Sequence, residues 1–327
     1  AKMDGDIEKI ATKKATVPEA YSRPWALFDN ARSGFAALLR EFEADGGRRV
    51  LLPAYIGWSA KEGSGLWDPV RSTGLELSFY RLDRRLGVDL DHLRDRLSAG
   101  ASTMVLVVHY FGRPAEGGRE AVALARGAGA IVVEDEAHAM LSDVVGGICG
   151  RDGHAAFFSL HKLLPQAQGG MVVTKGPGFG ERALDQGGAV VAEPWSWDLR
   201  AIADVRRRNA RCLADAMLPL AEDLEPLWTD WDERAVPQTL PFIVKRANRD
   251  RLYEELNSRG VGAVSLYHTL VDPIVREEFP DAHWLARRII NLPVHQDVRE
   301  EDIPKVVAVL GEALEALRTG SDGGRAS

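Results

Sequence analysis

Apolar runs and helical patterns alternate along the first half of the chain. The apolar runs are RVLLP (49–53), LELSFY (75–80), TMVLVVHY (103–110), AIVVEDEA (130–137), AAFFSL (155–160) and GMVVT (170–174). Several are apolar throughout, which is typical of strands in a parallel sheet covered on both faces. Helical spacing predicts helices between them, at GFAALLREFEA (34–44), DLDHLRDRL (89–97) and GREAVALARGAGA (118–130). This alternation predicts an α/β fold with a large, doubly wound, mainly parallel sheet.

The second half has a different pattern. Long helical stretches at 198–217, 248–260 and 300–318 surround one short strand candidate, TLPFIVK (239–245). We therefore expect a large α/β domain over 1–178, followed by a linker loop and a smaller α+β domain over 179–327. The Gly-rich, aperiodic segment 176–197 is predicted to be the boundary or an active-site loop.

Charge and composition exclude several classes of protein. A net charge of −7 argues against a nucleic-acid binder, and the basic run Arg206–Arg208 is predicted to be a solvated helix face. The two cysteines, Cys149 and Cys212, form no metal-ligand spacing, so no metal is expected. The N-terminus lacks the apolar core of a signal peptide, and no run approaches the ~20 apolar residues of a membrane span. These features predict a cytoplasmic protein without a membrane segment.

The candidate chemistry lies where the predicted strands end, because ligands of open α/β sheets bind beyond the carboxyl ends of the strands. Polar residues at these ends are Tyr55, His109, Asp135, His138, Ser159 and Lys162. By itself, Asp135 is read as a helix cap or salt-bridge residue, and Lys162 as a surface lysine. Together they match pyridoxal phosphate (PLP), which needs a lysine for its aldehyde and a carboxylate for its pyridine nitrogen.

PLP also needs a phosphate cradle and an aromatic cover. The turn ARSGFAALL offers Ser33, Gly34 and the free N–H groups of a helix start, and the Ser159 hydroxyl is a further candidate. Trp58 and Tyr55, just past the first strand, are the candidates for the aromatic cover. Plain core packing is a competing reading for each of these two rings.

Six motifs in one order carry a family resemblance. They are SGFAAL, VLLPAYIGWSA, VVHYFGRPAE, VVEDEAHAM, FFSLHKLLPQAQGGMVVTKG and ARRIINLPVHQDVREEDI. With them the chain resembles the DegT/DnrJ/EryC1/StrS aminotransferases, a sugar-aminotransferase branch of the PLP-dependent transferase fold type I, over about residues 25–318. The resemblance implies a homodimer with the active site at the subunit interface.

The resemblance also implies roles for individual residues. Lys162 would bond to the cofactor aldehyde, Asp135 would face the pyridine nitrogen and His138 would lie near the phenolic oxygen. Phosphate would be bound by Ser159 and by the backbone N–H groups of Gly34 and Phe35. Substrate contacts are expected from Tyr55, His161, Tyr267 and His268.

The chain departs from the family pattern in three places. Ser159 precedes Lys162 by three residues where the family more often has five. Phe35 replaces the threonine that often follows the phosphate-binding glycine. Segment 176–197 replaces a G-x-N-x-R-M segment, which usually brings an asparagine to the neighbouring subunit's phosphate and shapes the sugar pocket.

The resulting hypothesis is an aminotransferase that moves an amino group from an amino acid, glutamate or glutamine, to a carbonyl acceptor such as a keto-sugar. Alternatives are another PLP reaction, such as elimination, dehydration or cyclisation of an amino-acid-like substrate, and a non-catalytic scaffold. Family dehydratases replace the lysine with histidine, so Lys162 argues against that version. A dinucleotide-dependent dehydrogenase is excluded because no G-x-G-x-x-G follows the first strand.

Overall fold

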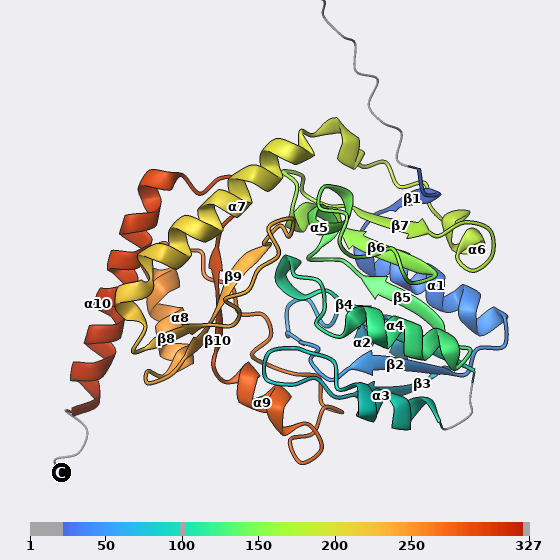
Figure 1. The fold of residues 1–327 in the computed structure, drawn as a ribbon, viewed down its shortest axis with the longest axis horizontal. Coiled ribbons are helices and arrows are strands. Elements are labelled where there is room, and N and C mark those ends of the chain that lie inside the picture. The colour runs from blue at the N-terminus through green and yellow to red at the C-terminus, as the bar shows by residue number, and fades with distance from the viewer. Residues whose placement is uncertain (1–21, 99–101, 323–327) are drawn as a thin grey trace, which may run out of the picture.

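Seven strands form one sheet in the computed structural model, which describes residues 22–98 and 102–322 (Figure 1). Their order across the sheet is β1-β7-β6-β5-β4-β2-β3. The strands are β1 (Trp25–Phe28), β2 (Arg49–Pro53), β3 (Glu76–Tyr80), β4 (Thr103–Val108), β5 (Ile131–Asp135), β6 (Ala155–Ser159) and β7 (Gly170–Thr174). The pairs from β3 to β6 are parallel, whereas β7 and β1 join antiparallel at one edge. The sheet is therefore mainly parallel, as predicted.

Helices cover both faces of this sheet. In Figure 1, α1 (Ala31–Ala44) lies behind the strands and α4 (Gly118–Gly127) lies in front. Shorter helices complete the two layers: α2 (Trp67–Arg71), α3 (Leu90–Leu97), α5 (Met140–Val144) and α6 (Glu181–Leu184). The predicted doubly wound α/β layering is thus confirmed.

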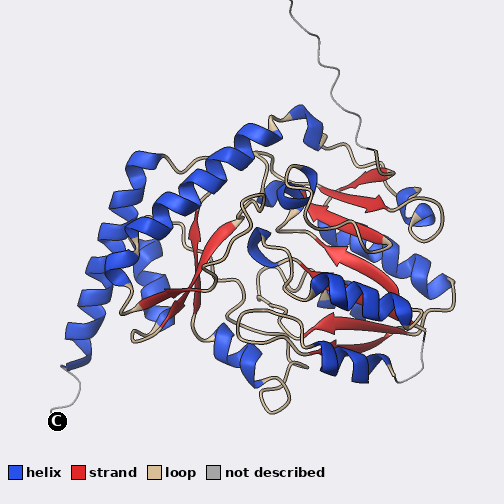
Figure 2. Ribbon diagram, viewed as in Figure 1, coloured by secondary structure: helices blue, strands red, loops and turns tan. Residues whose placement is uncertain are grey.

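A second, antiparallel sheet has the order β10-β9-β8 (Figure 2). Its strands are β8 (Leu224–Pro226), β9 (Thr239–Val244) and β10 (Ile289–Pro293). The helices of this part are α7 (Leu199–Ala216), α8 (Arg249–Ser258), α9 (Pro280–Ala286) and α10 (Ile303–Asp322). Helix α7 runs from the edge of the large sheet to the three-stranded sheet (Figure 1).

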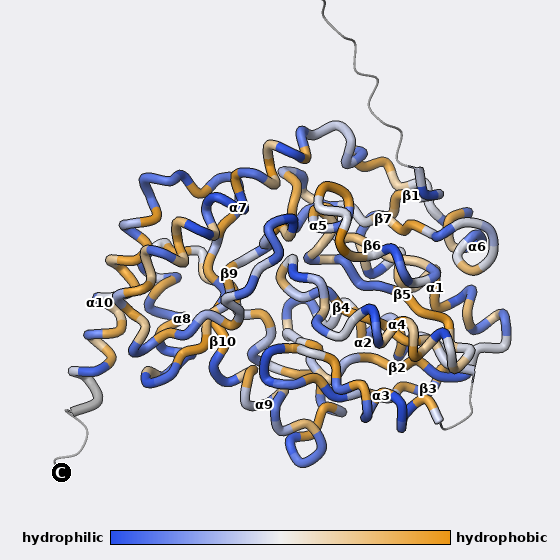
Figure 3. Tube along the Cα trace, in the orientation of Figure 1, coloured by the Kyte–Doolittle hydropathy of each residue, from blue (hydrophilic) through white to orange (hydrophobic). Residues whose placement is uncertain are grey.

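Apolar residues are concentrated in the strands, and α7 and α10 alternate between hydrophobic and hydrophilic positions (Figure 3). One buried cluster around Leu252, Ile290 and Leu310 belongs to the small sheet alone. The core of the large sheet, however, also includes Trp228 and Leu285 from the second half of the chain. The domain boundary at 178/179 stays a prediction, since the two parts share packed surface.

The predicted elements differ from the observed ones at their ends, and several short observed elements were not predicted. The helix predicted from Gly34 begins at Ala31, because Asn30 caps it by accepting the N–H of Ser33 at 2.9 Å. Strands β1, β8 and β10 have no counterpart in the prediction. β1 and β8 span only four and three residues, too few for a periodic signal. Among the described residues, no helix is long and apolar enough to span a membrane.

The prediction of a solvated face at Arg206–Arg208 is wrong for Arg206, which is 2% exposed. Its guanidinium donates to the backbone oxygens of Leu163 (3.2 Å) and Gln238 (3.1 Å) and to Oε1 of Gln296 (3.1 Å). Burial lowers the pKa of Arg206 to about 10, so the side chain is still charged at neutral pH. Arg206 thus ties α7 to the turn that carries Lys162.

Replacement of Arg206 by methionine is expected to lower the free energy of unfolding by about 2–4 kcal/mol, because buried carbonyl groups lose their donor. Arg208→Met is the matched control, since exposed Arg208 only pairs loosely with Glu300 at 3.6 Å and should change stability by less than about 0.5 kcal/mol. Urea unfolding of the two variants measures the difference. Equal midpoints would show that the Arg206 contacts contribute no stability.

Candidate active site

One cavity of about 760 Å³ opens at the carboxyl ends of the parallel strands. Its volume lies within the range of ordinary small-molecule sites. Eight predicted site residues line it: Tyr55, Trp58, Asp135, Ser159, His161, Lys162, Tyr267 and His268. The topology therefore brings together residues from four segments that lie far apart in the sequence.

Lys162 lies on a 3₁₀ turn, Leu160–Lys162, that follows β6. The turn folds back on β7 because the N–H of Leu160 donates to the carbonyl oxygen of Gly169 at 2.9 Å. Gly169 has a φ of +131°, and a Cβ on Gly170 would lie 2.5 Å from the backbone nitrogen of Ala31. The Gly169–Gly170 pair is thus needed for the turn and for close approach of α1.

The electrostatics of Lys162 favour a reactive amine. Burial lowers its pKa, while the negative charges of Asp135 and Glu62 act in the opposite direction. Its Nζ lies 3.0 Å from Nε2 of His138. A lowered lysine pKa increases the fraction of neutral amine, which is the nucleophilic form.

Asp135 ends β5 and is 5% exposed. Its Oδ1 accepts the N–H of Ala137 at 2.7 Å. Burial raises the pKa of Asp135 to about 6, against the lowering effects of this hydrogen bond and of electrostatic interactions with Lys162 and His109. No ion pair to Asp135 is present within residues 22–98 and 102–322. A positively charged donor in the cavity would therefore stabilise its ionised form.

His138 is buried beside the cavity, with its ring stacked on Phe111 at a centroid distance of 5.8 Å. Burial, followed by the charge of Lys162, holds the pKa of His138 well below its usual range, so the ring is neutral. Its Nδ1 accepts the N–H of Phe111 at 3.4 Å, which leaves the proton on Nε2. Nε2 can then donate to the unprotonated amine of Lys162.

Gly34 and Phe35 are not where the prediction puts them. They lie in the second turn of α1 and do not line the cavity, because the helix begins three residues earlier than expected. The N–H of Gly34 donates within the helix to the oxygen of Asn30 (3.3 Å), and the ring of Phe35 stacks on Phe157. The first-turn residues Ala31 and Arg32 line the cavity instead. An Asn before a helical run is a known cap signal and marks this start.

Of the other predicted site residues, Ser159 and Tyr55 are buried, whereas Trp58, His161 and His268 are exposed. Ser159 is 2% exposed, and its Oγ lies 3.4 Å from Nδ1 of His161, which is exposed along with His268. Tyr55 is fully buried, and its hydroxyl accepts the N–H of Tyr267 at 3.1 Å. Trp58 is 41% exposed.

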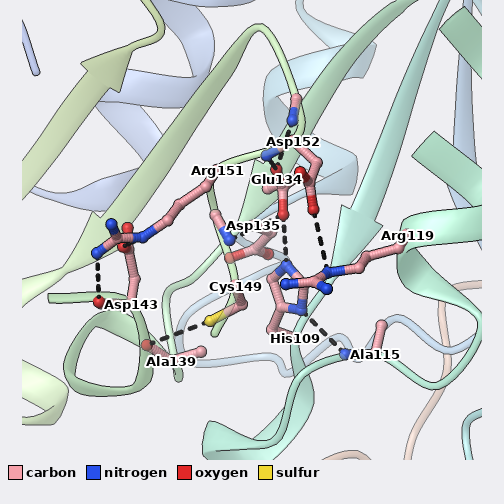
Figure 4. Close-up of polar contacts among 12 residues, drawn as sticks. His109, Ala115, Arg119, Glu134, Asp135, Ala139, Asp143, Cys149, Arg151 and Asp152 are labelled. Atoms are coloured by element: carbon pink, nitrogen blue, oxygen red, sulfur yellow. Dashed lines mark hydrogen bonds and ion pairs between the residues drawn. The ribbon is translucent and has the colours of Figure 1, made fainter. Parts of the chain in front are cut away.

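Behind Asp135 lies a buried pair that sequence reasoning did not predict (Figure 4). Nε2 of His109 contacts Oε2 of Glu134 at 2.9 Å, and its Nδ1 accepts the N–H of Ala115 at 3.0 Å. His109 and backbone N–H groups including that of Gly153 (2.6 Å) lower the pKa of Glu134 to about 2, although burial opposes them. The sequence VVED gives no local signal for this pair. The partners of Glu134 come from other segments, since His109 follows β4 and Gly153 lies in the loop after α5.

His109 also belongs to a cluster with Glu136 and Cys149 whose potential ligand atoms lie within 4.8 Å of one another. Both ring nitrogens of His109 already have partners. The histidine therefore has no lone pair to offer, and we assign no metal to this cluster.

Comparison with known proteins identifies the family. The model of the DegT/DnrJ/EryC1/StrS aminotransferase family matches residues 28–187 and 198–311 and passes over part of the predicted loop. The chain is 27% identical over 330 residues to dTDP-4-dehydro-2,3,6-trideoxy-D-glucose 4-aminotransferase of Saccharopolyspora spinosa, covering 86% of this chain and 83% of that protein.

Two solved structures have the same fold. DesI, solved in the presence of its TDP-sugar product, superposes with a TM-score of 0.74 at 21% identity, over 92% of this chain and 83% of that one. GDP-4-keto-6-deoxymannose-3-dehydratase superposes with a TM-score of 0.68 at 18% identity, over 88% of each chain. The family match covers most of the chain, and with it the predicted fold type I and the predicted cofactor class are confirmed: the chain belongs to the DegT/DnrJ/EryC1/StrS aminotransferase family and is a PLP-dependent aminotransferase.

Proposed function

We propose that the protein transfers an amino group from glutamate or glutamine to the carbonyl carbon of a nucleotide-linked keto-sugar. The observation that carries this proposal is the joint presence of the Lys162 amine and the Asp135 carboxyl in one cavity of an aminotransferase-family chain. The similar Saccharopolyspora spinosa protein is named for a dTDP-linked 4-dehydro sugar. Arg32 and Lys61 on the lining of the same cavity suit an anionic diphosphate.

The donor set of the cavity fits PLP. Lys162 supplies an amine with a lowered pKa, and Asp135 supplies a carboxyl that would gain a cationic partner from a protonated ring nitrogen. We assign the phosphate to Ser159 and to the first-turn N–H groups of Ala31 and Arg32, which replace Gly34 and Phe35 in this role. Neutral His138 is assigned to the phenolic oxygen.

The chain's own residues account for the proton transfers. When bound, the cofactor withdraws electrons from the reacting carbon of the amino acid through its protonated ring. Nζ of Lys162, whose pKa is lowered by burial, would take the proton from the donor's Cα and deliver it to the cofactor carbon bonded to the transferred nitrogen. His138 holds that amine at 3.0 Å, and Asp135 keeps the ring nitrogen charged. We assign His161 and His268 to the substrate side of the cavity.

We also propose a homodimer. The mouth of the cavity exposes Trp58 by 41%, together with the charged residues Lys61 and Glu62. A second copy over this mouth would shield the reaction from water. The family likeness supports this arrangement.

Dehydration is the second candidate, because the fold is shared with a 3-dehydratase. Lys162 stands where the family's dehydratases have histidine, which favours amino transfer. The two reactions differ in whether the amino group leaves with the product or stays on the cofactor.

Lys162→Ala is expected to bind PLP without covalent attachment and to lose at least ~10³-fold in turnover, because the amine is both attachment point and base. Borohydride reduction followed by peptide mapping should label residue 162 in the wild-type protein and nothing in the variant. Lys175→Ala, which removes an exposed lysine near the end of β7, serves as the control and should behave like wild type. A label on any other lysine would contradict the assignment.

Glutamate or glutamine alone, without a sugar, should convert the bound cofactor completely to its amine form. Absorbance spectra and chromatography of the released cofactor check this half-reaction. Subsequent addition of a nucleotide-linked 4-keto-sugar should restore the aldehyde form and give an amino sugar. Release of ammonia from the amino acid with the aldehyde form unchanged would instead indicate elimination, and loss of a sugar hydroxyl without an amino-sugar product would indicate dehydration.

Asp135→Asn should stabilise the protein when PLP has been removed. The pKa of Asp135 is raised in the folded protein from 3.8 to about 6, so the folded state binds this proton more tightly than the unfolded chain. Wild type therefore loses stability relative to the variant as the pH rises from about 4 to 6, by up to about 3 kcal/mol above pH 7.

Urea unfolding of the two PLP-free proteins between pH 4 and 8 measures the gap. Exposed Asp95→Asn is the control, for which no comparable pH-dependent gap is expected. A wild type more stable than Asp135→Asn at pH 7.5 would refute the expectation.

A further inference from the structure

A segment of the small domain, residues 264–271, closes one side of the cavity. At one end it joins β10, where Val264 and Asn291 exchange backbone hydrogen bonds of 2.9 and 3.1 Å. At the other end it pairs with the segment after β2: Trp58 N–H donates to Thr269 and Val271 N–H donates to Ile56, both at 3.0 Å. The segment is thus fixed to both domains.

Tyr267 is the aromatic residue among the six residues of this segment, 264–269, that line the cavity. Its backbone N–H donates to the hydroxyl of Tyr55 at 3.1 Å, and the two rings meet edge to face at 5.8 Å. Tyr55 is fully buried, so it gives Tyr267 a rigid support. The position of the Tyr267 ring is therefore determined by the large domain, although the residue belongs to the small one.

The ring of Tyr267 fills the space beside Gly57. A Cβ added to Gly57 would lie 2.5 Å from Cγ and 2.7 Å from Cβ of Tyr267. Gly57 is not among the glycines with positive φ, so its backbone would accept a side chain. What requires glycine at position 57 is the presence of the Tyr267 ring.

The ring of Tyr267 also packs near His138, a residue of the proposed cofactor site. It lies nearly parallel to His138, with a centroid distance of 6.3 Å and an interplanar angle of 24°. Burial raises the pKa of the Tyr267 phenol, and the charge of Asp135 raises it further. Tyr267 and Asp135, the carboxyl that we assign to the ring nitrogen, both line the cavity.

The two aromatic candidates from the sequence are less suitable. Trp58 is 41% exposed, and its backbone N–H is used to hold Thr269. The ring of Tyr55 is enclosed between Tyr110 and Tyr267. We propose that Tyr267, carried by the small domain and seated over Gly57, is the aromatic side chain that covers the cofactor ring. This inference rests on the proposed PLP site and is independent of the sugar acceptor.

The test compares PLP release and the visible circular dichroism of the bound cofactor in Tyr267 variants of the full chain. Tyr267→Leu should release PLP about tenfold faster or more and lose much of the visible dichroism, since an aromatic cover is removed. Tyr267→Phe should stay within about threefold of wild type, because the ring and not the hydroxyl supplies the cover. Trp58→Leu should have the smaller effect of the two leucine variants.

Moving the aromatic ring from position 267 to position 57 tests whether the two side chains would occupy the same space. Gly57→Phe alone should bind PLP poorly, because the new ring collides with Tyr267. Adding Tyr267→Gly to Gly57→Phe should restore slow release, to a rate well below that of Tyr267→Gly alone. If the double variant releases PLP as fast as Tyr267→Gly, the shared-volume argument fails.

The outcomes separate the two proposals. Wild type that is labelled at Lys162 by borohydride, with Tyr267→Leu unchanged in release and dichroism, overturns the cover and leaves the PLP site intact. Faster release from Trp58→Leu than from Tyr267→Leu overturns it in favour of Trp58. Wild type without any label at Lys162 overturns the cofactor site itself.

Discussion

The burial of an amine and a carboxyl in one cavity is the constraint on which the rest of the site depends. Burial shifts both groups toward their neutral forms, so the pKa of Lys162 falls and that of Asp135 rises to about 6. A neutral amine can attack an aldehyde, and a buried carboxyl gains most from a cationic partner. The cavity is thus less stable empty than filled, and a cofactor with an aldehyde and a basic ring nitrogen supplies what both groups lack.

Keeping an unstable pair in place requires contacts from distant parts of the chain. The Lys162 turn is held by β7 through Gly169, and the next residue, Leu163, accepts hydrogen bonds from Arg206 (3.2 Å) and from the side-chain nitrogen of Gln296 (3.3 Å). Gln296 follows β10 of the small sheet. The position of the lysine therefore depends on α7 and on the small domain as much as on its own strand.

The sequence predicted the parts of the site that local patterns determine. Asp135 and Lys162 follow apolar strands whose carboxyl ends meet at one sheet edge, so their proximity followed from the topology. The predicted start of α1 was wrong because the Ser-Gly pair looked like a helix start, whereas the Asn30 cap three residues earlier determines it. Arg206 was taken for a surface residue, because its partners are carbonyl groups from segments that no periodicity connects to it.

The packing of Tyr267 against Gly57 is another contact that local sequence patterns could not predict. More than 200 positions separate the two residues, and neither carries a local signal for the other. Because Tyr55 fixes the backbone of Tyr267, any displacement of the small domain relative to the large one changes both the cavity wall and the Leu163 contacts. The small domain is therefore connected to the cavity wall through Tyr55 and Tyr267, and to the Lys162 turn through Leu163.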